Sequence, residues 1–282
     1  MYIFFSEGRL GNQLFQYQFI NSHINKNKRT YCFGMGELSK TFILYDPNIR
    51  VVELSQRCYF LVLKLVRPVF RFFAKIRVLG YIAQEHKNGR PAQGTIIKKG
   101  LISVTFIETH FFQSDFFKKS PVNLLIKKPF LSKANSILTS LGIDKNFVFI
   151  HVRRGDYLEE SFNGHYGIDL PISYYINAIK IVEKQIANPY FIFMSDDIEF
   201  IKENFSAIDH QYISSEGMMV DFALMSLCDG GICSNSTFSW WGASLIYNKK
   251  IVIMPRYWYG WKSKVESHIG IQPPWAQILD IE

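Results

Sequence analysis

The sequence predicts an α/β protein with two domains, of which the C-terminal one is a doubly wound parallel sheet. In the second half, short apolar runs alternate with segments whose apolar residues recur at helical spacing. That pattern is typical of parallel strands covered by helices on both faces. The 282 residues, 48% of them hydrophobic, suit two domains or one large domain and exclude a disordered chain.

The second half gives the clearer pattern, because each β-rich run is bounded by polar turn residues before a helical segment begins. Such an order predicts helical crossovers between parallel strands, and hence a doubly wound domain. Strands are expected at residues 147–152, 190–194, 231–233 and 251–254, and helices at residues 172–187, 221–228 and 237–247.

The first half is less regular. A strand at residues 2–5 leads into a turn at Gly8 to Gly11 and a helix at residues 12–26, with further strands expected near residues 31–33 and 102–107. We expect the domain boundary between residues 128 and 145. The predicted domains are residues 1–140, which are irregular, and residues 141–282, which end in an aromatic tail.

Composition excludes several classes of protein. The most apolar stretch, residues 59–82, is interrupted by five basic residues, so no run approaches the ~18–20 uncharged residues of a membrane span. The first residues resemble a strand and not a signal peptide. The four cysteines lack zinc-site spacing and are expected to be buried, reduced thiols. We expect a cytoplasmic protein.

The loop after the strand at residues 147–152 is the first candidate site. Arg153 and Arg154, followed by Gly155, lie at the carboxyl end of a buried strand, where open α/β sheets bind ligands. A guanidinium pairs bidentately with phosphate or carboxylate. Successive residues of an extended chain point in opposite directions, so we expect one arginine to face the ligand and the other to brace the loop. A purely structural ion pair is the alternative.

A second candidate loop, from Ser234 to Ser239, follows the next predicted strand and opens a helix. Small hydroxyl residues at a helix start cap it, and the exposed N–H groups there also form an anion site. Two such loops at one sheet edge indicate a pyrophosphate. The sequence contains neither a Walker A motif nor a G-x-G-x-x-G motif, so it does not support an ATPase or a dinucleotide dehydrogenase.

These loops also carry a resemblance to a known family. The chain resembles the bacterial α-1,2-fucosyltransferases (glycosyltransferase family 11) over nearly its whole length. The resemblance implies a GT-B type fold with two Rossmann-like domains facing a cleft, GDP-fucose as the donor, inversion at the sugar, and neither a cofactor nor a metal. The matching stretches are residues 8–17, 151–157, 195–197 and 221–243.

The resemblance implies roles for individual residues. His151 and Asp221 would contact the nucleoside, because a carboxylate accepts both guanine N1–H and the exocyclic amino group. Arg153 would bind the β-phosphate and, with Asn12, act in catalysis. The implied donor-binding residues are His151, Arg153, Arg154, Asp221, Asn235, Ser236, Thr237, Phe238 and Ser239, and the implied acceptor-side residues are Gly11, Asn12, Gln13 and Asp156.

The predicted activity is transfer of L-fucose from GDP-β-L-fucose to the 2-hydroxyl of a galactose in an oligosaccharide acceptor, such as a lipid-linked O-antigen or cell-surface glycan. Alternatives are a core N-acetylglucosamine or protein acceptor. The general base stays open among Glu7, Asp156 and Glu160. Asp196 and Asp197 are adjacent instead of forming Asp-x-Asp, and are expected to cap a helix.

Charge is concentrated between residues 54 and 107, where ten basic residues accompany one acid, Glu85. The rest of the chain is close to neutral, which argues against a nucleic-acid binder. Within residues 57–79, a basic stripe of a helix divided at Pro68 is either a solvated face or a contact with anionic membrane lipids. The stripe consists of Arg57, Lys64, Arg67, Arg71 and Lys75.

Overall fold

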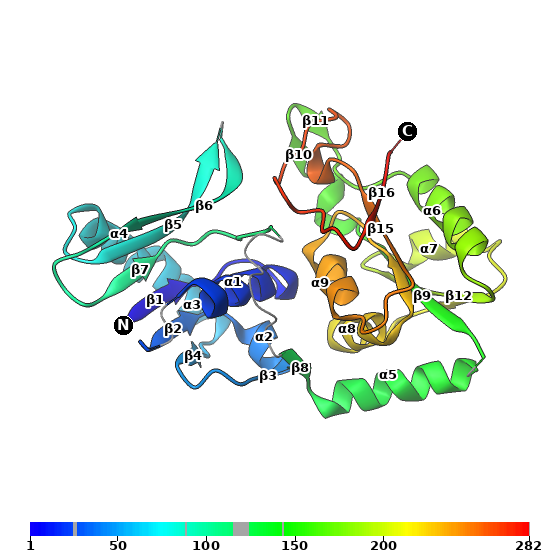
Figure 1. Ribbon diagram of the computed structural model, residues 1–282, viewed down its shortest axis with the longest axis horizontal. Coiled ribbons are helices and arrows are strands. Elements are labelled where there is room, and N and C mark those ends of the chain that lie inside the picture. The colour runs from blue at the N-terminus through cyan, green and yellow to red at the C-terminus, as the bar shows by residue number, and fades with distance from the viewer. Residues whose placement is uncertain (25–26, 88, 115–123, 143, 282) are drawn as a thin grey trace. The chain divides into compact units, whose positions relative to one another are not determined.

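The chain forms two compact units, each with its own sheet (Figure 1). The computed structural model describes residues 1–24, 27–87, 89–114, 124–142 and 144–281. The N-terminal unit comprises Met1–Leu125 with His268–Ile271, and the C-terminal unit comprises Ile126–Ser267 with Gln272–Glu282.

The sheet of the N-terminal unit has the order β4-β2-β1-β7-β5-β6. Its strands run parallel except for the hairpin of β5 and β6. The strands are β1 (Tyr2–Phe5), β2 (Thr30–Phe33), β4 (Ile49–Val52), β5 (Gly80–Lys87), β6 (Arg90–Lys98) and β7 (Thr105–Ile107), and β3 (Phe42–Leu44) pairs separately with β8 (Leu124–Ile126).

The helices of this unit include a long, interrupted segment before β5. Pro68 lies in the first turn of its last part, directly after a π-helical stretch; proline cannot donate a helical hydrogen bond, which divides the segment there. The helices are α1 (Leu10–His23), α2 (Gly36–Thr41), α3 (Gln56–Leu61), the π-helix η1 (Val62–Val66) and α4 (Arg67–Lys75).

The sheet of the C-terminal unit has the order β13-β12-β9-β14-β15-β16, and all of its strand pairs are parallel. The strands are β9 (Asn146–Val152), β12 (Pro189–Ser195), β13 (Gln211–Ile213), β14 (Gly230–Ile232), β15 (Ile251–Pro255) and β16 (Gln277–Leu279). The helices are α5 (Lys128–Leu141), α6 (Ile172–Gln185), α7 (Ile198–Phe205), α8 (Met218–Leu227) and α9 (Thr237–Leu245), with short 3₁₀ turns η3 (Gly155–Leu158) and η4 (Trp258–Gly260) and a hairpin of β10 (Ser161–Phe162) and β11 (His165–Tyr166).

Strand β9 forms the centre of this unit. Its side chains from Phe147 to Val152 are all buried, because helices cover both faces of the sheet (Figure 1). One face packs Val148 and Ile150 against α6 and α7, through residues such as Tyr175 and Ile201. The predicted α/β class is confirmed, and the strands and helices predicted for the second half lie within a few residues of the observed ones.

The region expected to contain the domain boundary is instead a helix. Helix α5 spans Lys128–Leu141 and belongs to the C-terminal unit, and its buried face packs on α8. The contacts divide the chain between Leu125 and Ile126. The helix predicted for residues 12–26 corresponds to α1, which ends at His23. Residues 25 and 26 of that prediction lie outside the described residues.

The aromatic tail packs within the C-terminal unit. Trp258 is completely buried, the Tyr259 ring lies edge-on to Tyr157, and the Trp261 indole N–H donates to the Ile168 carbonyl at 3.3 Å. The tail therefore stabilises the loops that follow β9.

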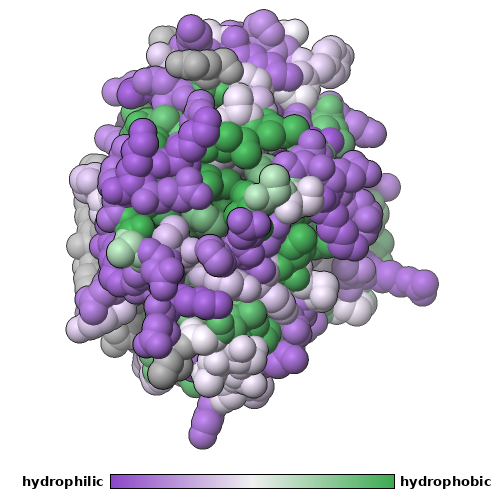
Figure 2. All heavy atoms as spheres, turned by 90° about the vertical axis from the view of Figure 1, so that its right-hand side faces the viewer, coloured by the Kyte–Doolittle hydropathy of each residue, from purple (hydrophilic) through white to green (hydrophobic). Residues whose placement is uncertain are grey.

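The side of the molecule that carries α6 and α7 is mostly hydrophilic, with separate smaller hydrophobic areas (Figure 2). Within the described residues, no helix is long and apolar enough to span a membrane.

Candidate functional site

The strand order of the C-terminal unit identifies its ligand-binding edge. From β9 the chain builds the sheet toward β12 and β13, then returns to β14 on the other side of β9. In doubly wound sheets, ligands bind beyond the carboxyl ends of the two strands where the order reverses. The loops that follow Val152 and Ile232 meet at that point.

A hydrogen bond joins these two loops. Ile232 pairs with Ile150, which places Ser234 beside the end of β9, and Nδ1 of His151 lies 2.7 Å from the Ser234 hydroxyl. Burial, together with the nearby charge of Arg153, lowers the pKa of His151 to about 3. The imidazole is therefore neutral at neutral pH, and it connects the loops without adding charge to the crevice.

Arg153 lies at the start of the first loop, between two carboxylates. Because Val152 pairs with Ser195 in the sheet, the next residues of the two strands are neighbours, and Nη1 of Arg153 lies 2.7 Å from Oδ2 of Asp196. A second ion pair joins Arg153 to Asp156 in η3. The Arg153 side chain, which is 15% exposed, is thus fixed at the binding edge.

Arg154 braces the loop. Its Nε lies 3.1 Å from Asp197 and its Nη1 lies 3.2 Å from Asp169. The guanidinium also stacks 3.8 Å from the centre of the Phe200 ring, and the backbone N–H donates to Asp196 at 2.9 Å. Arg153 and Arg154 thus each hold two carboxylates and are similarly exposed, at 15% and 20%, so the expected division into a ligand-facing and a bracing arginine stays a prediction.

One residue of the acidic pair after β12 has the capping role that the sequence predicted for both. Asp197 accepts a hydrogen bond from the Phe200 N–H at 3.1 Å and caps α7, while Asp196 pairs with Arg153. Within the described residues, no group of three or more histidine, cysteine or acidic side chains is arranged to hold a metal ion.

The second loop ends at the first turn of α9. Ser236 caps this helix by accepting from the Phe238 N–H, and Thr237 begins it. The Ser239 hydroxyl is buried and donates to the carbonyls of Ser234 and Ser236 at 3.4 and 3.1 Å, so it closes the loop. The first N–H groups of a helix have no intrahelical partners, and here they lie at the binding edge.

Asn235 has one satisfied and one unsatisfied side-chain atom. Its Nδ2 donates to the Ile168 carbonyl at 2.6 Å. Its Oδ1 is buried and has no hydrogen-bond partner among the described residues. A buried amide oxygen left in this state costs free energy, which makes it a natural acceptor for a ligand hydroxyl or N–H.

Asp221 lies in the first turn of α8 and accepts a hydrogen bond from the Ser214 hydroxyl. Burial, with a smaller contribution from Glu216, raises its pKa to about 6 against the effect of that hydrogen bond. The next residue, Phe222, packs its ring 5.3 Å from Phe238. Since the Phe238 ring also lies 5.5 Å from His151, α8 borders the same edge.

Three of the four acceptor-side residues predicted from the resemblance lie in the N-terminal unit, whereas Asp156 lies in η3 of the C-terminal unit. The glycine turn places Asn12 in the first turn of α1, and its Oδ1 accepts from Gln113 Nε2 at 2.7 Å. Gln13 is buried and bonds to the Gly8 carbonyl and the Leu38 N–H, so it braces the turn, while Gly11 is buried within α1.

Two of the three candidate bases already have cationic partners. Glu7 pairs with Arg67 at 2.5 Å and Asp156 pairs with Arg153, whereas Glu160 is exposed. Sequence reasoning placed Ser234 in a candidate loop without giving it a role, and it missed Gln113 and Glu108, because these residues matter through contacts between segments distant in the chain. Ser234 begins the quoted hydroxyl motif, whereas no motif in the sequence marks Gln113 or Glu108.

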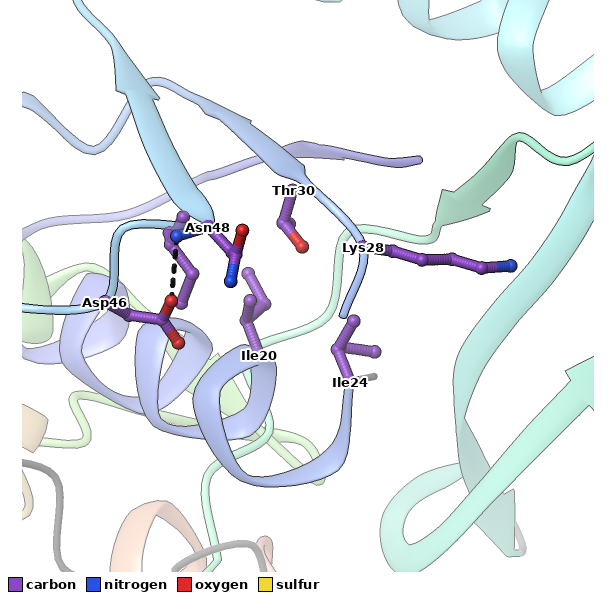
Figure 3. Close-up of a pocket in the computed structure, with 7 residues that line it drawn as sticks. Ile20, Ile24, Lys28, Thr30, Asp46 and Asn48 are labelled. Carbon is purple, nitrogen blue, oxygen red and sulfur yellow. Dashed lines mark hydrogen bonds between the residues drawn. The ribbon is translucent and has the colours of Figure 1, made fainter. Parts of the chain in front are cut away.

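A pocket in the N-terminal unit is too small for a sugar nucleotide. It encloses about 10 Å³, roughly the space of one water molecule. Figure 3 shows Asp46 accepting from the Asn48 N–H and the Lys28 side chain extended away from both. This pocket has no arrangement of groups that would bind a phosphate.

Comparisons with known proteins agree with this geometry. The family model for glycosyl transferase family 11 matches residues 95–278. An α-1,2-colitosyltransferase from Escherichia coli is 31% identical over 96% of both chains. The O-antigen biosynthesis glycosyltransferase WbnK from Escherichia coli is 35% identical over 42% of this chain and 41% of its own length.

A rat (Rattus norvegicus) galactoside α-(1,2)-fucosyltransferase 2 is 31% identical over 40% of this chain and 34% of its own length. Among solved structures, a family 9 glycosyl transferase from Veillonella parvula superposes with a TM-score of 0.53 at 10% identity, covering 99% of this chain and 85% of that one. The α/β fold is therefore of the GT-B type, and the chain belongs to glycosyl transferase family 11 and is a glycosyltransferase.

Proposed function

We propose that the protein transfers L-fucose from GDP-β-L-fucose to the 2-hydroxyl of a galactose residue, with inversion and without a metal ion. The observation that carries this proposal is the position of Arg153. Its guanidinium lies at the point where the strand order reverses, beyond the end of β9. The first turn of α9 provides N–H groups at the same edge.

The carboxylates that hold Arg153 in the free protein would exchange for a diphosphate. Asp156 lies in an exposed 3₁₀ turn with a side chain that is 60% exposed, so its ion pair is the easier one to replace. A β-phosphate would then receive the guanidinium as a bidentate partner. Asp196 would continue to hold the Arg154 N–H and orient the loop.

In the proposed reaction, the bond between the anomeric carbon and the β-phosphate oxygen breaks, and its electron pair stays on the departing GDP. The acceptor oxygen forms the new bond from the opposite face, and its proton passes to solvent or to one of the candidate bases Glu7, Asp156 and Glu160. Arg153 and the α9 turn stabilise the charge that builds on the phosphate, an effect worth about 3 kcal/mol per group. We assign the orientation of the attacking hydroxyl to Asn12.

Asp221 and His151 are proposed to select the base. An ionised carboxylate accepts the two N–H donors on one edge of guanine, which uracil lacks. The raised pKa of Asp221 fits a carboxylate whose desolvation is offset only in part by the Ser214 hydroxyl and would be offset further by a ligand that donates to it. The ring of Phe238 beside His151 adds an apolar surface for the nucleoside.

A second donor is favoured by one comparison. The relative that matches 96% of this chain is a colitosyltransferase, and colitose is the 3-deoxy analogue of L-fucose.

We also propose that the acceptor is a lipid-linked glycan at the cytoplasmic face of a membrane, which fits the O-antigen role named for WbnK. A core N-acetylglucosamine or protein acceptor remains the alternative acceptor class.

The test is a matrix of donors and acceptors. Purified protein is incubated with GDP-fucose, GDP-colitose, GDP-mannose or UDP-galactose and with β-galactosides, chitobiose or a serine peptide, and products are identified by mass spectrometry and NMR linkage analysis. We expect α-1,2-linked fucosyl galactoside. A product with GDP-colitose alone would correct the donor, and the absence of GDP binding by calorimetry would contradict the proposal as a whole.

A further inference from the structure

The helical segment from α3 through α4 exposes an apolar face. Its inner side packs on the N-terminal sheet through Tyr59, Phe70 and Ala74, and of its residues only Ala74 is buried. On the outer side, Phe60 is 64%, Leu65 61% and Phe72 57% exposed. The same surface includes Leu61, Val66, Val69, Phe73 and Ile76.

The loop after β6 extends this face. The backbone N–H groups of Leu101 and Ile102 donate to the carbonyls of Arg77 and Val78, directly after α4, at 3.0 and 3.1 Å. Leu101 is nevertheless 84% exposed. A Cβ on Gly100 would come within 2.2 Å of the Leu79 backbone, so the loop is held tightly while its apolar side chains project outward.

The charges around this face differ from the basic stripe predicted from the sequence. Arg67 pairs with Glu7, and Arg71 binds Glu108 through Nε and Nη2. Both guanidinium groups therefore have acidic partners, although the Arg71 side chain is still 48% exposed, and the lipid contact expected of Arg67 and Arg71 stays a prediction. The exposed bases outside these two ion pairs are Arg57, Lys64, Lys75, Arg77, Lys98 and Lys99.

No acidic residue interrupts the segment, since none occurs between Leu54 and Gln84. An amphipathic helix that presents aromatic and aliphatic side chains beside exposed bases is what interfacial membrane binding requires. We propose that this face, which we call the α3–α4 face, binds an anionic bilayer, with the apolar side chains inserted at the interface and the lysines and arginines on the lipid phosphates.

Charge decides between a bilayer and a second copy of the chain. A two-fold interface would place the same surface on both partners, and exposed bases without acids would then repel each other. An anionic bilayer removes that repulsion and attracts each exposed base. The face is also the convex side of a helix, which suits insertion better than it suits a groove.

Cys58 provides a reporter on the face itself. It lies in α3 and is exposed, whereas the three other cysteines are buried. An environment-sensitive fluorophore attached to Cys58 should shift to shorter wavelength with vesicles of phosphatidylcholine and phosphatidylglycerol, but not with phosphatidylcholine alone. Added salt should weaken the encounter.

Matched variants test the contributions of the apolar side chains and of the exposed bases separately, in co-sedimentation with the same vesicles. We expect at least tenfold weaker binding for Phe72→Gln, against no change for the equally non-conservative Tyr247→Gln, an exposed aromatic residue of the other unit. The double change Lys64→Gln/Lys75→Gln should weaken binding similarly, whereas Lys180→Gln/Lys184→Gln on α6, with the same loss of charge, should not.

Transfer to a soluble acceptor should be unchanged in all four variants, which separates this inference from the proposed function. Equal binding by the α3–α4 variants and their controls, or no binding by the wild type, would overturn the inference. So would a dimer, seen by light scattering, that Phe72→Gln dissociates, because a second copy would then be the occupant of the face.

Discussion

Arg153 and Asp196 form a 2.7 Å ion pair that follows directly from the register of two neighbouring strands. Val152 and Ser195 are paired in the sheet, so the residue after each lies beside the other. The ion pair thereby holds a guanidinium in a fixed position at the ligand-binding edge of the free protein. The paired Arg153 side chain is still partly exposed to solvent. Replacement of its carboxylate partner by a phosphate is the central step of the proposed donor binding.

Replacing Arg153 with alanine should lower the rate of transfer by a hundredfold or more, since one preorganised charge contributes about 3 kcal/mol to the transition state. Arg153→Lys should also fail, because an ammonium lacks the bidentate geometry. Initial rates with GDP-fucose measure the effect, and circular dichroism checks the fold. Arg50→Ala in β4, an exposed arginine, is the control. Activity of Arg153→Ala within tenfold of wild type would remove Arg153 from the mechanism.

Chelation should leave transfer unchanged. The proposed clamp neutralises the diphosphate with Arg153 and the first turn of α9, while Asp196 and Asp197 are occupied by arginine partners and a helix cap. Rates before and after EDTA, with Mn²⁺ then added back, measure this. Loss of activity in chelator and its recovery with Mn²⁺ would return the two aspartates to a metal-binding role.

Asp221→Asn should weaken the binding of GDP by about tenfold or more, since hydrogen bonds to a charged group contribute on the order of 1.5–3 kcal/mol. The affinity for a ribose diphosphate without a base should change little. Calorimetry with both ligands separates the two effects, with Asp209→Asn, an exposed aspartate, as the control. Equal losses of affinity for both ligands would mean that Asp221 only stabilises the first turn of α8 and does not contact the base.

The pH dependence of Asp221 has a defined sign. Its pKa is raised to about 6 from an ordinary value of 3.8, so the folded protein favours the protonated carboxyl, and this group's contribution to stability falls as pH rises from about 4 through 6. GDP affinity should show the opposite trend and fall as pH drops through 6, because a protonated carboxyl accepts fewer hydrogen bonds. Asp221→Asn should therefore keep or raise the thermal midpoint at pH 7.5 while GDP affinity falls.

The C-terminal unit could be predicted well because its strands are buried on both faces. Such strands appear as continuous apolar runs, and the alternation with helices defines their parallel connection. From that topology alone, the loops after β9 and β14 had to lie at one edge. The His151–Ser234 contact could not be predicted, since it depends on which strand neighbours β9 in space.

The orientation of α3 and α4 could not be predicted for a similar reason. Apolar residues occupy both sides of this segment, so periodicity does not define the inner face. The carboxylates of Glu7 and Glu108, 60 and 37 residues away from their partners, decide it by pairing with Arg67 and Arg71. Cys58 was likewise expected to be buried and is exposed.

Thiol chemistry tests this orientation directly. Burial raises the pKa of Cys32, Cys228 and Cys233, so these thiols should react slowly in the native protein. We expect Ellman's reagent to titrate one thiol rapidly and three more only after denaturation. Cys58→Ser should abolish the rapid phase. A wild-type protein without a rapid phase would show that the α3 segment is packed differently, and a rapid phase that persists in Cys58→Ser would show that one of the three buried thiols is accessible.

Gly8→Ala tests whether the position of Asn12 matters for transfer. Gly8 has φ +87°, and a Cβ there would lie 2.4 Å from Asn12 Nδ2, so alanine must displace the Asn12 side chain from its contact with Gln113. Gly164→Ala is the matched control, because Gly164 has φ +82° but open space around its Cβ position. Both variants carry the backbone strain of about 1–2 kcal/mol that a left-handed residue costs an L-amino acid, and both should lose some thermal stability. Only Gly8→Ala should lower kcat, by tenfold or more, with GDP affinity retained, since its effect is on the residue proposed to orient the attacking hydroxyl. If the two variants transfer fucose equally well once their stability is taken into account, Asn12 has no part in orienting the acceptor.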